Sequence, residues 1–139
     1  MAEVENAKVV FELVTPMALA VSENVDMVVV PGIDGDFGVL PGHSPVLTTI
    51  RPGLIKIYTN GEVTKSLFVE GGFAEANAKG CTVLAEGVTD ILDISAEDAQ
   101  ARLVDARKAL ADTNGTIAKD EVKVAEAMVM AASGNTKQH

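Results

Sequence analysis

The sequence contains few aromatic residues, one cysteine and an excess of acidic side chains. Among its 139 residues there are no Trp, one Tyr and four Phe, and the formal net charge at pH 7 is −9. Proteins that hold single-stranded nucleic acid stack the bases on aromatic rings, and cationic side chains neutralise the phosphates. The composition therefore argues against nucleic acid as a partner.

Cys81 is the only cysteine, so the chain forms no internal disulfide and is compatible with a reducing compartment. Because Cys81 alternates with apolar neighbours, it is predicted to be a buried strand residue, and not a nucleophile with an adjacent base. No apolar run approaches the ~18 residues of a membrane span, and the N-terminus has neither a signal core nor a transit pattern. We expect a protein that works in the cytoplasm and does not insert into lipid.

The most distinctive stretch runs from Pro31 to Pro45 and reads Pro-Gly-Ile-Asp-Gly-Asp-Phe-Gly-Val-Leu-Pro-Gly-His-Ser-Pro. Its prolines fix φ and its glycines can take positive φ, which predicts a stiff, shaped loop. Asp34, Asp36, Phe37 and His43 would stand at its crest. Such a mixture of polar and aromatic side chains suggests contact with another molecule.

Short segments rich in apolar and β-branched residues fill the chain before and after this loop. They are separated by Gly and Pro turns, and Asn60-Gly61 is the strongest hairpin signal. With no alternating helices, the pattern predicts an antiparallel β-sandwich or flattened barrel over residues 1–94. The expected strands are Lys8–Val14, Ala18–Val21, Val25–Val30, Pro45–Ile50, Leu54–Thr59, Val63–Glu70, Phe73–Asn77 and Thr82–Ala85.

At Ser95 the pattern changes to a helical period. Ser95 is a candidate N-cap, and apolar residues then recur at three- and four-residue steps. A turn at 112–115 precedes Thr116, the expected cap of a second helix. Residues 95–139 are therefore predicted to form an antiparallel α-helical hairpin, with a frayed tail from Ser133 to His139. Its Ala-rich faces bury little area, so we expect it to be weakly held.

No arrangement of side chains predicts an active site. Gly71-Gly72 lacks the Lys and Ser/Thr of a phosphate-binding loop. Asp34 and Asp36 start like a calcium loop, but the later ligands are missing. We expect no catalytic residue, no metal and no cofactor. A small metal-dependent enzyme using Asp34, Asp36 and His43 remains an alternative.

Three segments resemble one known family. They are Val28 to Pro45, then Ile50-Arg51-Pro52-Gly53, then Val69-Glu70-Gly71-Gly72-Phe73. Together they are similar to the epsilon subunit of the bacterial F-type ATP synthase, whose fold is an N-terminal β-sandwich followed by a helical hairpin. The resemblance covers nearly the whole chain and is weaker after Ser95.

The resemblance implies a non-catalytic rotor subunit of the central stalk, on the cytoplasmic face of the bacterial inner membrane. It would link the gamma subunit to the ring of c subunits and so couple proton flow to ATP synthesis. Asp36, Phe37, His43 and Pro45 are the residues expected at the ring. The helical hairpin is a candidate contact with the alpha and beta subunits of the catalytic head. The rival interpretation is a free-standing sandwich adaptor whose helices bind a signalling partner.

The family's helical hairpin can also inhibit ATP hydrolysis, and in some members it binds ATP. Their signature, Ile/Leu-Asp-x-x-Arg-Ala, corresponds here to Leu92-Asp93-Ile94-Ser95-Ala96-Glu97, so Ala96 replaces the Arg and Glu97 the Ala. Losing the cation weakens phosphate binding, and we expect no ATP binding. The second helix offers only Lys119 and Lys123 as basic residues before Ser133, and Asp120, Glu121 and Glu126 offset them. Inhibition is therefore predicted to be weak or absent.

Overall fold

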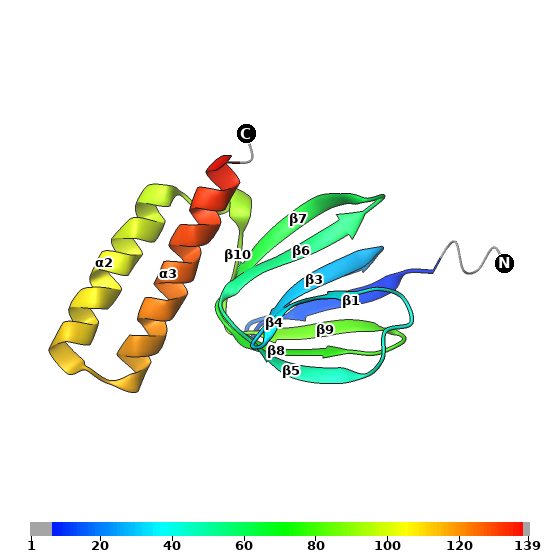
Figure 1. Ribbon diagram of the computed structural model, residues 1–139, viewed down its shortest axis with the longest axis horizontal. Coiled ribbons are helices and arrows are strands. Elements are labelled where there is room, and N and C mark those ends of the chain that lie inside the picture. The colour runs from blue at the N-terminus through cyan, green and yellow to red at the C-terminus, as the bar shows by residue number, and fades with distance from the viewer. Residues whose placement is uncertain (1–6, 138–139) are drawn as a thin grey trace. The chain divides into compact units, whose positions relative to one another are not determined.

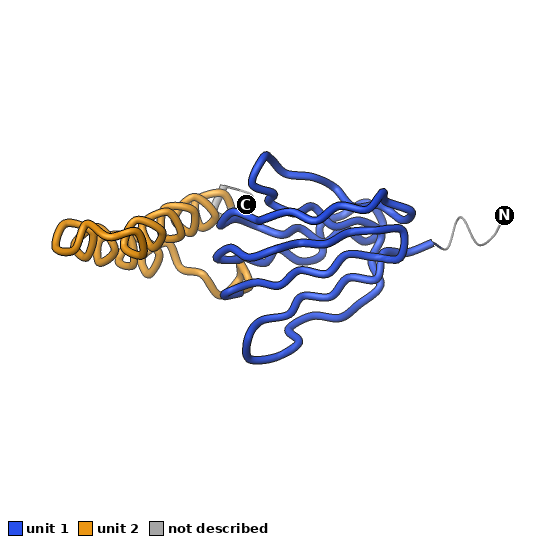
Figure 2. Tube along the Cα trace, turned by 90° about the horizontal axis from the view of Figure 1, so that it is seen from below, with its two compact units in different colours: residues 1–88 blue, residues 89–139 orange. Residues whose placement is uncertain are grey.

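The computed structural model describes residues 7–137, which form two compact units that meet between Val88 and Thr89 (Figure 2). The first unit is built of strands and the second contains the helices (Figure 1). The elements are β1 (Val9–Val14), β2 (Leu19–Val25), β3 (Met27–Gly32), β4 (Gly35–Val39), β5 (Val46–Ile50), β6 (Gly53–Thr59), β7 (Glu62–Val69), β8 (Gly72–Ala76), β9 (Gly80–Ala85), β10 (Val88–Asp90), η1 (Ile91–Asp93), α2 (Ala96–Thr113) and α3 (Thr116–Lys137). A β-sandwich followed by two helices is the fold that the sequence predicted.

From β7 to β2, the strands of the first unit follow the order β7-β6-β3-β5-β8-β9-β1-β2, and β4 pairs with β3. Strands β3 and β5 are joined by one residue pair, Gly32 opposite Ile50. At this narrow join the sheet folds over into two layers (Figure 1). The sequence predicted antiparallel pairing throughout, but β1 and β9 are parallel. A parallel pair needs a long connection, which the strands between β1 and β9 supply.

Large apolar side chains fill the space between the two layers. On β1, Val9, Phe11 and Leu13 point inward and are almost fully buried, as the period of two in a strand requires. Cys81 lies in the same core, as predicted, and burial raises the pKa of its thiol to about 12. The thiol is therefore protonated and inert at neutral pH.

The local turn signals predicted the turns correctly, but two strands, β4 and the short β10, were missed. Asn60 and Gly61 both have positive φ, 55° and 80°, as the predicted tight hairpin between β6 and β7 requires. The strand predicted to stop at Val30 continues to Gly32. The next strand, β4, lies inside the stretch that was predicted to be a loop.

The first α-helix of the second unit, α2, begins where the sequence changes to a helical period. The Ser95 hydroxyl accepts a 2.9 Å hydrogen bond from the Asp98 amide, which confirms the predicted N-cap of α2. Asn114, with φ 49°, ends that helix. Gly115, and not Thr116, caps α3, because its carbonyl accepts the first hydrogen bond of that helix, from Lys119. The expected fraying from Ser133 was wrong as far as Lys137, which is helical, and residues 138–139 lie outside the described part.

Candidate functional site

The first half of the stretch from Pro31 to Pro45 is a regular β-hairpin of β3 and β4. Pro31 lies opposite Asp36 and Gly32 opposite Gly35, which leaves Ile33 and Asp34 as a two-residue turn. Gly35 has φ 138°, a conformation that other residues rarely adopt. Both turn side chains are exposed, so they form the tip of the hairpin.

The base of this hairpin is tied to the end of β5. The Ile33 amide donates to the Thr49 carbonyl, and the Arg51 amide donates to the Pro31 carbonyl, each over 2.9 Å. A Cβ added at Gly53 would lie 3.1 Å from the Cβ of Pro31, so the backbone of β6 also packs closely there. The hairpin is therefore fixed to both layers of the sandwich.

The Arg51 side chain bridges the two strands of the hairpin. Its Nη1 donates to the Gly32 carbonyl over 2.6 Å, and its Nη2 lies 2.5 Å from Oδ1 of Asp36. The guanidinium thus pairs with a carboxylate and a backbone oxygen at once, which its planar fork of donors permits. Asp36 is held by the protein's own cation.

Phe37 and His43 lie near each other beside the hairpin. The Phe37 ring is half-buried and packs against the sandwich core. Its ring centroid is 6.4 Å from that of His43, and the planes are tilted by 45°. His43 Nδ1 donates to the Ser44 carbonyl over 2.6 Å, and Pro45 is exposed just before β5.

The connection after β4 is a tight turn made by Pro41 and Gly42. The His43 amide donates to the Leu40 carbonyl over 3.2 Å, and Gly42 has φ 83°. These features define a type II turn, in which Pro stands second and Gly third. The turn brings His43 back toward the hairpin.

Three of the four predicted ring-contact residues, Asp36, Phe37 and His43, therefore belong to one substructure, and Pro45 ends the loop that follows. Their contact with a ring stays a prediction. Sequence reasoning missed Arg51, which was noted only as part of a motif. It also gave no role to Ile33. The position of Ile33 between a glycine and an acid is typical of an exposed turn.

A row of apolar side chains crosses the outer face of four neighbouring strands. Phe73 lies opposite Leu84, Leu84 opposite Val14, and Val14 opposite Leu19. Directly paired residues share a face of the sheet, so the four side chains are neighbours. Phe73, Leu84 and Leu19 are each more than half exposed. A shallow pocket of about 360 Å³ lies along this apolar row, which the sequence did not predict.

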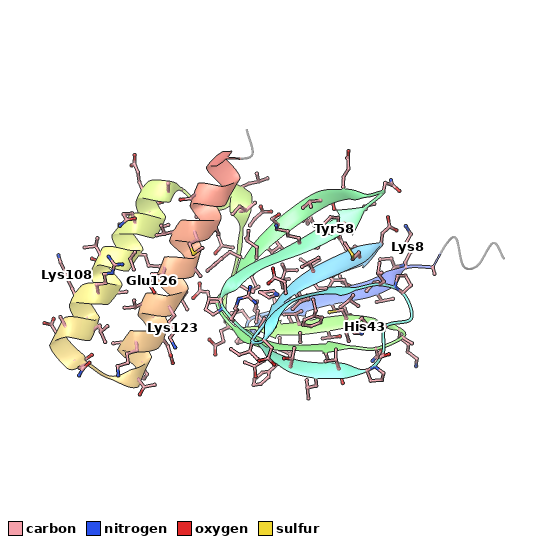
Figure 3. The ribbon with its side chains drawn as sticks, viewed as in Figure 1. Lys8, His43, Tyr58, Lys108, Lys123 and Glu126 are labelled. Atoms are coloured by element: carbon pink, nitrogen blue, oxygen red, sulfur yellow. The ribbon has the colours of Figure 1, made fainter. Side chains whose placement is uncertain are left out.

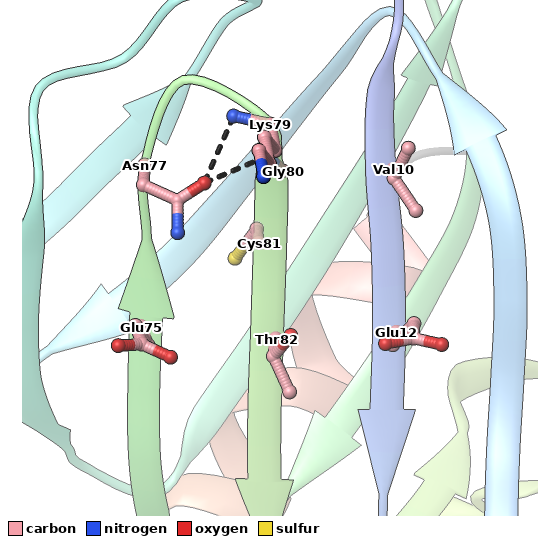
Figure 4. Close-up of a pocket in the computed structure, with 8 residues that line it drawn as sticks. All are labelled: Val10, Glu12, Glu75, Asn77, Lys79, Gly80, Cys81 and Thr82. Atoms are coloured by element: carbon pink, nitrogen blue, oxygen red, sulfur yellow. Dashed lines mark hydrogen bonds between the residues drawn. The ribbon is translucent and has the colours of Figure 1, made fainter.

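A polar row runs beside the apolar row. Glu75, Thr82 and Glu12 lie at one level on β8, β9 and β1 (Figure 4). Just after the end of β8, the Asn77 side-chain oxygen accepts hydrogen bonds from the Lys79 and Gly80 amides, which closes the β8–β9 turn. A pocket of about 220 Å³ lies there. The outer face is thus apolar with a polar edge, the usual composition of a protein-binding surface.

In the helical unit, acidic residues of α3 pair with arginines of α2. Arg102 donates to Glu121 over 2.7 Å, and Arg107 lies 3.7 Å from Glu126. Figure 3 labels Glu126 and Lys123 on α3 and Lys108 on α2. Two of the acids that offset Lys119 and Lys123 in the sequence, Glu121 and Glu126, are therefore engaged within the unit.

The segment that corresponds to the nucleotide signature is largely exposed, and backbone amides in it and just after it are hydrogen-bonded to nearby side chains. The Asp90 side chain accepts from the Leu92 amide, and Leu92 is 81% exposed. Ser95 caps α2, and Ala96 is its first residue. Ala96 supplies no cation at the position where the signature has an arginine. The expected lack of ATP binding stays a prediction.

Within residues 7–137, no three His, Cys, Asp or Glu side chains converge as metal ligands. Asp36 is paired with Arg51 and the His43 ring with Ser44, so the alternative site of Asp34, Asp36 and His43 does not assemble. In the same part of the chain, no helix has both the length and the hydropathy needed to cross a membrane.

Comparisons with known proteins agree on one family. The family described as ATP synthase, Delta/Epsilon chain, beta-sandwich domain matches residues 8–91. The chain is 48% identical over 130 residues to the ATP synthase epsilon chain of Paramagnetospirillum magneticum, covering 91% of this chain and 98% of the relative. It is 46% identical over 128 residues to that of Rhodospirillum rubrum, covering 89% and 96%.

Two solved structures share the fold. One is a chain of the Euglena gracilis mitochondrial ATP synthase, OSCP/F1/c-ring, with a TM-score of 0.75, 19% identity, and coverage of 94% of this chain and 82% of that one. The other is a chain of the Tetrahymena thermophila mitochondrial ATP synthase central stalk and c-ring, with a TM-score of 0.62, 15% identity, and coverage of 93% and 96%.

Proposed function

The chain belongs to the family of ATP synthase epsilon chains, and from that premise we propose that it is a non-catalytic rotor subunit of the central stalk. It would link the gamma subunit to the ring of c subunits and pass torque from proton flow to the catalytic head. It would then lie at the cytoplasmic face of a bacterial inner membrane, held there by its partners.

The observation that carries this proposal is the apolar row of Val14, Leu19, Phe73 and Leu84. An isolated protein rarely leaves neighbouring large apolar side chains on the outer face of a central sheet. Burying them against a partner would stabilise the complex by roughly 25 cal/mol of free energy per Å² of apolar area. We assign this face to the gamma subunit, a partner whose contact surface must carry complementary apolar side chains.

The β3–β4 hairpin and the turn that follows it suit the second contact. Its backbone is tied to β5, and the two residues of its tip, Ile33 and Asp34, are exposed. We assign the ring-facing surface to this substructure, with Asp36, Phe37, His43 and Pro45 as the residues that build it. A stiff element is required there, because a compliant foot would absorb torque.

The helical unit has few features that would support a regulatory role. Glu121 and Glu126 neutralise two arginines of α2, which are then less available to an acidic partner. Lys119 and Lys123 add few cations on α3 itself. We propose that the unit inhibits ATP hydrolysis weakly or not at all and does not bind ATP. Contact with the alpha and beta subunits would then be transient.

The proposal is tested by mixing the full chain with a gamma-containing catalytic head that lacks epsilon. Calorimetry should show tight one-to-one binding. Leu84→Glu should lower the affinity by about 100-fold or more, because it buries an unpaired charge. Val63→Glu is the matched control, since Val63 is an exposed valine on β7, in the other layer, and should bind as wild type.

If the wild-type chain does not bind the head, the stalk assignment fails and a free-standing adaptor becomes the better interpretation. If Val63→Glu weakens binding and Leu84→Glu does not, the gamma subunit contacts the other layer. ATPase activity of the head should be the same with the full chain and with a chain ending at Ile94. A lower rate with the full chain alone would show that the helical unit inhibits.

A further inference from the structure

We propose that Arg51 positions the β3–β4 hairpin, and that Asp34, not Asp36, is the carboxylate that the hairpin offers to a basic side chain of the ring. This inference rests on the proposed function, in which the hairpin faces the c subunits. It assigns different tasks to two acids that stand two residues apart.

The carboxylate of Asp36 already pairs with a cation of the same chain. Its Oδ1 lies 2.5 Å from Nη2 of Arg51, and the side chains are 59% and 40% exposed. An outside cation would have to compete with this guanidinium, which is held in place by a second bond to the Gly32 carbonyl. A cation of the ring would therefore have to share a carboxylate whose charge Arg51 already neutralises.

Asp34 is placed differently. It is an exposed residue of the two-residue turn, and within residues 7–137 its carboxylate has no hydrogen bond or ion pair. An exposed carboxylate at the tip of a stiff element attracts a cation at little desolvation cost and with a strong dependence on salt. Ile33, 56% exposed beside it, adds an apolar contact.

Arg51 fixes the direction in which this tip points. It bonds Gly32 on β3 and Asp36 on β4, the residues just below the turn, and its own amide bonds Pro31. The residue thus holds both strands of the hairpin against the end of β5. A rigid tip loses less conformational entropy on binding, so Arg51 acts on affinity through Asp34.

The test measures binding to a purified, detergent-solubilised c ring. Head complexes containing gamma and the full chain are titrated onto the ring at low and moderate salt. We expect Asp34→Asn to weaken binding about tenfold at low salt and to flatten the salt dependence. Asp36→Asn should cost only about twofold, because Arg51 keeps its bond to the Gly32 carbonyl and the Asn oxygen can still accept. Glu62→Gln, which removes an exposed acid from the β6–β7 hairpin, is the matched control and should have no effect.

A double-mutant cycle separates positioning from general damage. Arg51→Gln should weaken binding about fivefold when Asp34 is present and less than about twofold in the Asp34→Asn background. Arg51→Lys should recover part of the loss, since one ammonium can reach one of the two oxygens but has no fork for both.

The proposal is overturned if Asp36→Asn costs as much as Asp34→Asn, or if Arg51→Gln has the same effect in both backgrounds. Every variant should still bind the gamma-containing head as wild type does, because the apolar row is unchanged. Failure of the wild-type chain to bind either head or ring would instead refute the proposed function. Normal wild-type binding with no effect of Asp34→Asn would refute this inference alone.

Discussion

The sandwich and the helical unit hold themselves together by different means. Between the layers of the sandwich, residues such as Phe11, Ile55 and Ile57 are fully buried. The core that α2 and α3 share consists of Leu103, Ala106 and Ala125, with two valines at its edge. Since each buried CH₂ group is worth about 0.8 kcal/mol, the helical core contributes far less per residue.

This difference fits the two proposed tasks. A sheet with a large core and a tied hairpin keeps its shape under load, as a torque-bearing foot must. A unit with a thin core and exposed ion pairs opens at a lower free energy and on shorter timescales. Stability is thus concentrated in the unit that carries both of the proposed binding surfaces. Four pairs of substitutions would break or sharpen the contrast.

The largest effect is expected from Gly72→Ala in β8. Its Cβ would lie 1.9 Å from the Leu84 carbonyl oxygen, and the φ of 137° is strained for any other residue. We expect a loss of at least about 3 kcal/mol in the free energy of unfolding, or no folding at all. Gly134→Ala in α3 meets open space and should raise the free energy of unfolding by about 0.5–1 kcal/mol. Urea titrations would measure both, and equal effects would contradict the contrast.

The next largest effect separates the two cores. Phe11→Ala should cost about 3–5 kcal/mol and expose Cys81, which lies in the same core. Leu103→Ala should lower the temperature at which helical ellipticity is lost while Cys81 stays unreactive to thiol reagents. If Cys81 becomes reactive in step with the loss of helix in Leu103→Ala, the two units unfold as one.

A smaller effect is expected from the ion pairs between α2 and α3. Arg102, 29% exposed, donates to Glu121 over 2.7 Å, whereas the Arg107–Glu126 pair is longer and more exposed. Glu121→Gln should therefore lower the free energy of unfolding by about 0.5–1 kcal/mol and Glu126→Gln by less, with the first loss shrinking in high salt. A larger loss for Glu126→Gln than for Glu121→Gln would show that the N–O distances do not determine how much each ion pair stabilises the unit.

Local signals in the sequence predicted most of the elements. Asn60-Gly61 and Ser95 act through their own backbone and nearest neighbours, so their turn and cap could be identified from the chain alone. The family resemblance pointed to the hairpin stretch without its geometry. The apolar row was not predictable, because Leu84 and Val14 become neighbours only through the parallel pairing of β9 with β1.

The missed strand β4 and the missed arginine have different physical causes. Gly35 and Gly38 suggest a loop, yet β4 forms because pairing with β3 satisfies its backbone. Arg51 finds its partners, Gly32 and Asp36, 19 and 15 residues away. Such contacts depend on how the sheet folds over at Gly32 and Ile50, and no local pattern encodes them.

The smallest effect concerns pH and lies in the sandwich. The Asp26 carboxylate pairs with Lys8 and accepts a 2.6 Å bond from the Asn60 amide, and these contacts lower its pKa. A lowered pKa in the folded state gives stability that is present above the unfolded value of about 3.9 and is lost as pH falls through the folded value. Asp26→Asn should therefore lower the urea midpoint at pH 7 but not at pH 2. Lys8→Gln should cause a similar loss, and the double variant little more. A difference between Asp26→Asn and wild type that persists at pH 2 would mean that the Asn side chain disturbs the turn itself, so that charge is not the cause.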